Sequence, residues 1–409
     1  MIYILAFIVL IGVIVFVHEL GHFWAARSVG VGVERFSVGM PPNFIDFTKT
    51  NKGLIIDIFF FSIKDGKLTW TKVFTTTLSS FKKPSETVYT IGLLPLGGYV
   101  KMKGILDENM DSDFKGADDE LESKNPLQKI WVMSAGVIMN LILTFFVFAM
   151  IGNIQGDSVT ENNNTVIDYV VPEQPAEISG MLAGDKILSI NNIKVDSWES
   201  TVENIEKNPK KTVPILLERD GEIISLSVSL GSKPNLSTGR VDQEVGTLGI
   251  SKKQKPVELN FSESFIYAYK ETRWAMTLMT SSLKMIFQGN VSRDEVGSVI
   301  MIGDMAGQAA QAGLVPFLFL MALISVNLAY INILPIPGLD GGHIALILIE
   351  VLMGRKLSVK ARIRIQSIGM FFLISLMIFL IFNDISRVIT GLFSYCLLYT
   401  SDAADEHSW

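Results

Sequence analysis

The chain has 409 residues, 49% of them hydrophobic, and a mean hydropathy of +0.38, which indicates an integral membrane protein with a soluble insert. Its 35 basic and 41 acidic residues give a net charge of −6, so no basic surface favours nucleic acid as a partner. The single cysteine, Cys396, excludes an internal disulfide and a cysteine-rich metal site, so a zinc site must use His, Asp or Glu.

A first transmembrane helix is predicted over residues 1–29, where Ile2–Val17 contains no charged residue. An H-E-x-x-H motif follows at its far end. Residues four apart share one helix face, so His18 and His22 can direct two imidazoles at one zinc ion, with the Glu19 carboxylate beside them as a base. Ionisable side chains inside a membrane helix are costly, which favours a functional site. The alternative is a signal anchor whose histidines mark the interface.

Residues 30–125 are predicted to form a membrane-associated β-region that ends in an acidic linker. Three segments have strand-like patterns: Val31–Val38, Leu54–Ile63 and Ile91–Val100. The second is too short to span a membrane, and the third is broken by Gly97 and Gly98. The pattern fits a β-hairpin beside the motif and a cytosolic β-subdomain equally well. Residues 107–122 are acidic and predict a mobile linker.

A second transmembrane helix is predicted over residues 126–152. Its small and polar residues Ser134, Ala135, Gly136 and Asn140 suit close helix packing. Asn140 can also form a hydrogen bond near the metal site, but the pattern favours a packing role.

Residues 153–257 return to a soluble composition and predict an α+β domain. A G-D-x-I-x-x-I-N pattern follows a short helix within residues 175–192, and two apolar-rich strands meet at an Asp220-Gly221 turn. The stretch resembles a bacterial PDZ domain, which accepts an extended peptide as an added strand. The alternative is a degenerate PDZ domain that acts as a spacer or size filter.

Residues 258–312 predict an amphipathic helix followed by a connector. The helix fits a position on the membrane surface and packing on the preceding domain nearly equally well.

A third transmembrane helix is predicted over residues 313–353, with a break at Pro335–Gly338. Irregular backbone at membrane depth is tolerated only when it is buried in protein or lines a wet cavity. Asp340 follows the break and needs a partner. A zinc ion held by His18 and His22 is the obvious candidate.

A fourth transmembrane helix is predicted over residues 365–384. The loop before it carries five basic residues at positions 355–364 and no acid, so the positive-inside rule places it in the cytoplasm. The 153–257 domain is then extracytoplasmic, residues 30–125 are cytoplasmic, and the H-E-x-x-H motif lies near the cytoplasmic face. Residues 394–409 look like a non-native tail and are left out of the argument.

Together, the H-E-x-x-H motif, the PDZ-like insert and the pattern N-x-x-P-x-P-x-L-D-G-G at residues 332–342 resemble the site-2 protease family. The most similar branch is the bacterial regulator of sigma-E protease, here with a single PDZ domain. The resemblance implies a mostly α-helical polytopic membrane protein with about four transmembrane helices, a membrane-associated β-region and one extracytoplasmic α+β PDZ domain.

The family also implies a zinc endopeptidase site. Zn²⁺ would be held by His18, His22 and Asp340, with Glu19 as general base and acid. The positions that match substrate-handling residues of the family are Asn327, Asn332, Pro335, Pro337, Gly97 and Gly98.

The substrates implied are transmembrane segments of single-span proteins, of the anti-sigma factor or remnant signal peptide type, cut in regulated intramembrane proteolysis. The partners implied are these substrates, a prior site-1 type protease and the lipid bilayer, in a bacterial inner membrane. The chain departs from the family at Met40-Pro41-Pro42, where a glycine-rich turn is expected, and in an extra segment at residues 43–90.

Two other classes of protein share some of these features. A secondary transporter also has broken helices and ionisable residues at membrane depth, but four spans without an inverted repeat are few. A catalytically dead scaffold would present the PDZ domain alone, yet the intact His18, Glu19, His22 and Asp340 argue against it.

Overall fold

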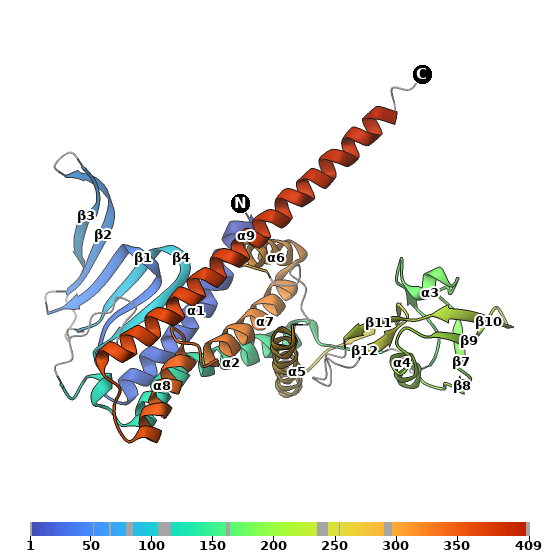
Figure 1. Ribbon diagram of the computed structural model, residues 1–409, viewed down its shortest axis with the longest axis horizontal. Helices are drawn as coiled ribbons and strands as arrows, with labels where there is room; N and C mark the ends of the chain where they lie inside the picture. Colours follow the sequence, from blue (N-terminus) through green and yellow to red (C-terminus); the bar gives the residue numbers. More distant parts are fainter. Residues whose placement is uncertain are drawn as a thin grey trace. The chain divides into compact units, whose positions relative to one another are not determined.

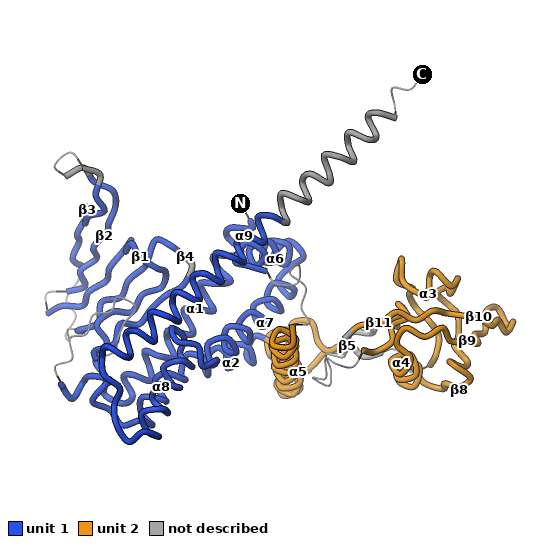
Figure 2. The backbone as a smooth tube through the Cα atoms, viewed as in Figure 1, with its two compact units in different colours: residues 1–147, 292–409 blue, residues 148–291 orange. Residues whose placement is uncertain are grey.

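The computed structural model describes residues 2–51, 53–64, 67–78, 85–104, 116–160, 164–234, 244–252, 254–289 and 297–405. It divides into two compact units, which Figure 2 colours separately. Unit 1 comprises residues 1–147 and 292–409, and unit 2 comprises residues 148–291.

The helices of unit 1 include the apolar segments of the sequence (Figure 1). They are α1 (Ile2–Ser28), α2 (Pro126–Gln155), α6 (Val299–Ala312), α7 (Leu314–Ile333), α8 (Asp340–Met353) and α9 (Val359–Asp405). Helix α2 continues past residue 147 into unit 2. Four helical segments are long and apolar enough to cross a membrane, namely α1, α2, α7 and Val359–Ser386 of α9. The predicted number of about four apolar helices of membrane-spanning length is therefore confirmed, while the third predicted span is divided into α7 and α8.

The loop before the fourth span is shorter than predicted. The helix begins at Val359, not at residue 365, so Lys360, Arg362 and Arg364 lie in its first turns and not in a loop. Arg362 is held there by ion pairs with Glu122 and Glu350. The backbone of α9 also runs on beyond residue 384 to Asp405, and residues 406–409 lie outside the described residues.

Helix α1 is buried along one ridge. Its buried residues include Ala6, Leu10, Ile14, His18 and His22, which follow one another at intervals of four. This spacing keeps them on a single face of the helix. Large apolar side chains on its other faces stay exposed, as a lipid-facing surface requires.

Helix α6 contradicts the prediction of a plain connector before residue 313. Two of its small residues are contact points with α1. Gly303 faces Phe7, and a Cβ at Gly307 would overlap the Tyr3 ring. Glycine is needed there because the two helices approach closely.

The break between α7 and α8 is held by local hydrogen bonds. The amide of Ile336 donates to the carbonyl of Leu334 at 2.7 Å, and that of Leu339 donates to Ile336 at 3.1 Å. A Cβ at Gly341 would overlap the carbonyls of Ile333 and Leu334. The glycine of the D-G-G sequence therefore lets α8 begin directly against the broken backbone and fixes where Asp340 lies.

The β-region of unit 1 is a four-stranded antiparallel sheet in the order β3-β2-β1-β4. Its strands are β1 (Val33–Thr50), β2 (Gly53–Lys64), β3 (Lys67–Leu78) and β4 (Val88–Met102). The predicted strands are confirmed, and the extra segment at residues 43–90 supplies the β2–β3 hairpin and the adjoining ends of β1 and β4.

Strands β1 and β4 bend and pair with each other twice. Phe36 of β1 has two partners in β4, Val100 and Tyr89, and Tyr89 also pairs with Phe47. The bends meet at Gly39 and Gly92, where a Cβ on Gly39 would lie 2.8 Å from the Gly92 carbonyl oxygen. Gly39 also has a φ of +92°, which favours glycine.

A buried apolar cluster joins this sheet to the helices. It contains Ala25 and Ala26 at the end of α1, Phe36 and Val100 of the sheet, and Val132 of α2. It therefore sets the sheet beside the last turns of α1, where the H-E-x-x-H motif lies.

The predicted acidic linker is wrong at its C-terminal end, while residues 105–115 lie outside the described residues. Glu122 lies in a short 3-10 helix (Leu121–Ser123) and pairs with Lys129, Lys356 and Arg362. Arg362 also pairs with Glu350 at 2.6 Å. Paired charges at this density need fixed geometry, so this end of the segment is anchored to α2, to the loop between α8 and α9, and to α9.

Unit 2 contains an α+β domain with its own core, as predicted. Its main sheet has the order β10-β9-β7-β8, and its core includes Ile187, Ile215 and Leu217, each fully buried. The elements of this domain are β6 (Tyr169–Val170), α3 (Pro175–Ile178), β7 (Lys186–Ile190), β8 (Ile193–Lys194), α4 (Trp198–Glu206), β9 (Thr212–Arg219), β10 (Glu222–Ser229), β11 (Gly231–Pro234), β12 (Glu244–Thr247) and β13 (Ile250–Ser251).

Two further elements of unit 2 flank that domain. Strands β5 (Asp157–Thr160) and β14 (Gln254–Val257) pair with each other, so the chain enters and leaves the domain side by side. Helix α5 (Phe261–Gln288) is capped at its N-terminus by Asn260, whose side chain accepts from the Glu263 amide. It confirms the predicted helix, and its place at a membrane surface stays a prediction.

Candidate metal centre

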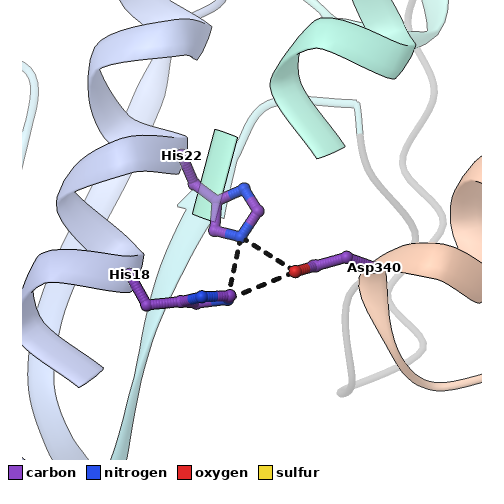
Figure 3. A group of neighbouring side chains, drawn as sticks. All are labelled: His18, His22 and Asp340. Atoms are coloured by element: carbon purple, nitrogen blue, oxygen red, sulfur yellow. Dashed lines mark hydrogen bonds and ion pairs between the residues drawn. The ribbon is translucent and has the colours of Figure 1, made fainter. Parts of the chain in front are cut away.

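Three side chains from opposite ends of the chain converge in unit 1 (Figure 3). His18 and His22 come from α1, and Asp340 is the first residue of α8. Nε2 of His18 lies 3.2 Å from Nε2 of His22 and 3.2 Å from Oδ2 of Asp340, and His22 Nε2 lies 3.4 Å from the same oxygen. Both histidines are about 6% exposed, so the three atoms meet in a largely buried position.

This triangle fits a zinc ion. With metal–ligand bonds of 2.0–2.1 Å in a tetrahedron, neighbouring ligand atoms are about 3.3 Å apart, and the three observed separations are 3.2, 3.2 and 3.4 Å. Oδ2 of Asp340 is buried and has no hydrogen-bond partner among the described residues. A buried carboxylate oxygen without a donor is costly, and a cation at the centre of the triangle would satisfy it.

The local structure prepares each ligand for this role. Nδ1 of His22 donates to the Val132 carbonyl at 2.8 Å, which leaves the Nε2 lone pair free for a metal. Asp340 lies in the first turn of α8, where the positive end of the helix dipole favours a carboxylate.

Glu19 lies next to the triangle and against the β-region. It is half-buried, and a Cβ on Gly98 of β4 would be 3.2 Å from its Cγ. The same Cβ would be 2.7 Å from the Ser37 carbonyl oxygen. Because Gly98 has no side chain, β4 can pass close to Glu19. The β-region therefore lies beside the H-E-x-x-H motif, which is one of the two arrangements that the sequence pattern left open.

The structure brings together only some of the predicted substrate-handling residues. Nδ2 of Asn332 lies 3.2 Å from Nε2 of His18, so Asn332 belongs to the site. Among the described residues, no hydrogen bond joins Asn327 to the three predicted ligands. Pro335 and Pro337 lie in the break that precedes Asp340, and Gly97 lies beside Met40.

Helix α2 supplies two residues whose place the sequence did not settle. A Cβ on Gly136 would overlap Nε2 of His22 and lie 2.5 Å from Cε1 of His18. Asn140 is fully buried, and its Nδ2 lies 3.2 Å from Nδ1 of His18. The packing role favoured for Asn140 is therefore incomplete. The G-x-x-x-N spacing was the available signal, because it sets both residues on one helix face.

Comparison with known proteins places these features in a family. The model of peptidase family M50 matches residues 6–66 and 59–376. A Campylobacter jejuni protein named as a zinc metalloprotease is 33% identical, with 94% of each chain covered. The regulator of sigma-W protease RasP of Bacillus subtilis is 26% identical over 94% of this chain and 98% of its own. A protein of Enterococcus faecalis named as the protease eep is 28% identical over 94% and 99%.

Proposed function

The chain belongs to peptidase family M50, the site-2 proteases, and is a membrane zinc metalloprotease; on this premise we propose that it cleaves transmembrane segments of single-span proteins in regulated intramembrane proteolysis. The observation that carries the proposal is the meeting of His18, His22 and Asp340 between apolar helices. Ionisable side chains that meet among membrane-length apolar helices indicate a functional site, which supports a substrate that is itself in the membrane.

We assign the three converging side chains as the zinc ligands. Two imidazole nitrogens and one carboxylate oxygen form a donor set typical of catalytic zinc, in which a fourth position stays open. When bound, zinc would polarise the peptide carbonyl and lower the pKa of water at the open position. The ligands themselves hold fixed positions and take no part in proton transfer.

Glu19 then moves the protons of the reaction. Its carboxylate accepts a proton from the water that attacks the peptide carbonyl carbon. As the C–N bond breaks, Glu19 gives that proton to the leaving amine. The side chain is adjacent to His18 in sequence but turned about 100° around α1, which suits a group that works beside the ligand triangle and not within it.

The substrate helix must unwind before it can be cut, because its carbonyls are engaged in hydrogen bonds within the helix. Asn332 is beside His18, and we assign it to bind freed backbone groups, with Asn327, which lies earlier in α7, as a second contact. The broken backbone at Pro335 and Pro337 and the bare backbone at Gly97 and Gly98 would let an extended segment approach closely. Because β4 is an outer strand of the described sheet, that segment can pair with it.

The domain of unit 2 is proposed to control which substrates reach the membrane. It has a groove of about 330 Å³ between α4 and the β12–β13 segment, lined in part by Trp198, Ile205 and Leu248. A PDZ-like domain uses such a groove for an extended peptide or acts as a size filter. We further propose that a site-1 type protease trims the substrate beforehand, with this domain outside and the metal centre near the cytoplasmic face of a bacterial inner membrane.

A cleavage assay tests the proposal. The wild-type chain and its Glu19→Gln variant are reconstituted in liposomes with candidate single-span proteins, such as anti-sigma factors and remnant signal peptides. We expect cleavage within the membrane segment by the wild type alone. If the wild type cuts only soluble peptides and leaves every membrane segment intact, the intramembrane proposal fails.

A further inference from the structure

One face of α2 lies directly over both histidines. Val132, Gly136 and Asn140 are four residues apart, so they follow one another along a single ridge of the helix. The carbonyl of Val132 accepts from Nδ1 of His22 at 2.8 Å. Gly136 leaves the space that the two rings occupy. Asn140 reaches Nδ1 of His18 at 3.2 Å.

The contact between Asn140 and His18 has two possible directions. With Nδ2 of Asn140 facing the ring, the amide donates to Nδ1, and the proton of the imidazole must then be on Nε2. That tautomer has no lone pair on Nε2 for a metal. A half turn of the amide instead places Oδ1 beside Nδ1, where it accepts from Nδ1–H and leaves Nε2 free.

A second observation favours the turned amide. Oδ1 of Asn140 is buried and has no hydrogen-bond partner among the described residues. In the turned position this oxygen would accept from His18 Nδ1–H. The contact would then match the one at His22, whose Nδ1–H donates to a backbone carbonyl of the same helix.

The backbone carbonyl of Asn140 also accepts hydrogen bonds from two side chains. It accepts from Oγ of Ser325 at 2.9 Å and from Oγ1 of Thr144 at 3.0 Å. Both donors are fully buried. The bond from Ser325 joins α2 to α7, whereas the bond from Thr144 lies within α2, so the carbonyl keeps a donor when either side chain is removed.

We propose that Asn140 is a positioning residue that accepts a hydrogen bond from His18 Nδ1–H through Oδ1 and so holds His18 in the tautomer and orientation that bind zinc. The inference rests on the proposed assignment of His18 as a ligand. Loss of such an outer hydrogen bond weakens metal binding by about 10–100-fold in other sites.

Zinc affinity tests this role without reference to proteolysis. The full chain is purified in detergent, freed of metal, and titrated with zinc against a chromophoric chelator. Asn140→Ala should bind zinc about 10–100-fold more weakly than the wild type. Asn140→Asp keeps an acceptor at the same place and should recover most of that loss. Ser325→Ala, which removes a bond to the Asn140 backbone only, is the matched control and should bind zinc nearly as the wild type does.

The outcomes separate this inference from the proposed function. If His18→Ala keeps wild-type affinity for zinc, the ligand assignment itself is wrong. If His18→Ala loses zinc but Asn140→Ala binds as tightly as the wild type, the ligand stands and the positioning role is refuted. Equal weakening in Asn140→Ala, Asn140→Asp and Ser325→Ala would also refute it, because helix packing would then explain the loss. Thermal unfolding of the metal-free proteins checks that each variant is folded.

Discussion

Oδ2 of Asp340 and Nε2 of His18 lie 3.2 Å apart, although the two residues come from opposite ends of the chain. The contact requires α1 and α8 to be placed by different partners. Helix α1 is held against the sheet and α2 through the cluster that contains Ala26 and Val132. Helix α8 starts where the backbone after α7 breaks and where Gly341 allows close approach. The metal centre is therefore a property of the assembled unit and not of either helix.

The first prediction separates the base from the ligands. Glu19→Gln should lose cleavage and keep zinc, because the three ligands remain while the proton acceptor is removed. Asp340→Ala should lose both. Zinc content by atomic spectroscopy, measured alongside cleavage, distinguishes the two variants. Stoichiometric zinc in purified Asp340→Ala would remove Asp340 from the ligand set.

The sequence predicts the parts of this site that depend on local spacing. His18, Glu19 and His22 follow from the helical repeat within one helix, and Asp340 follows from the proline break beside an ionisable residue at membrane depth. Local spacing did not decide whether Asn140 serves helix packing or the metal site. A membrane helix is apolar on all sides, so its pattern does not say which face meets α1.

Other features depended on contacts that no pattern in the sequence reveals. Gly39 and Gly92 meet because β1 and β4 both bend and pair with each other in two registers. The alternation of residues along one strand predicts only one register. Helix α6 lies in the predicted connector, and its close contacts at Gly303 and Gly307 are with α1, which is distant in the sequence. Glu122 looked solvated in an acidic run, and only the folded chain brings Arg362 to it.

The second prediction concerns the space that α2 leaves for the histidine rings. Gly136→Ala places a methyl group against both rings, so either the helices separate or the imidazoles turn away. Overpacking of this kind costs about 1–3 kcal/mol, and zinc affinity should fall at least about tenfold, the equivalent of about 1.4 kcal/mol. Gly12→Ala is the control, because a Cβ at Gly12 meets no atom within 4 Å. Wild-type zinc binding by Gly136→Ala would mean that α2 does not constrain the rings.

The third prediction is a pH dependence that arises at Glu122. Partial burial acts to raise its pKa, but hydrogen bonds from Arg362, Lys356 and Lys129 outweigh that effect and lower the pKa from 4.5 to about 2. A carboxyl group whose pKa is lower in the folded state stabilises the fold above its unfolded pKa, and this stability is lost as the pH falls from about 4.5 to about 2. Glu122→Gln should therefore lower the melting temperature at neutral pH by about 2–4 °C, the effect of about 1 kcal/mol.

The same comparison at acidic pH gives the decisive measurement for Glu122. The difference in melting temperature between the wild type and Glu122→Gln should shrink between about pH 5 and about pH 3, where wild-type Glu122 becomes protonated in the unfolded chain. Glu86→Gln is the control, because Glu86 pairs with Lys103 while its side chain is 80% exposed. A difference that stays constant with pH would assign the effect of Glu122→Gln to packing and not to charge.

The fourth prediction concerns the insert domain. Strands β5 and β14 pair side by side, so residues 164–251 can be replaced by a short Gly-Ser linker between them without separating the flanking segments. If the domain is a gate, this deletion should allow cleavage of full-length substrates that have not been trimmed outside the membrane. Trimmed substrates should be cut at the wild-type rate, which controls for an intact metal centre. Unchanged discrimination between full-length and trimmed substrates would leave the domain as a spacer.

The fifth prediction is the orientation of the chain in the membrane, and it rests on charge. The basic residues at positions 355–364 should stay in the cytoplasm, which places the β-region inside and the insert domain outside. In a Cys396→Ser background, cysteines are introduced at two exposed positions, Lys194 of the insert domain and Glu86 before β4. An impermeant thiol reagent should label Lys194→Cys on spheroplasts and should label Glu86→Cys only after permeabilisation.

Because His22 lies within two helix turns of Arg27, cleavage should then fall in the cytoplasmic half of the substrate helix and release a cytosolic fragment. The reverse labelling would place the metal centre near the outer face and product release outside the cell.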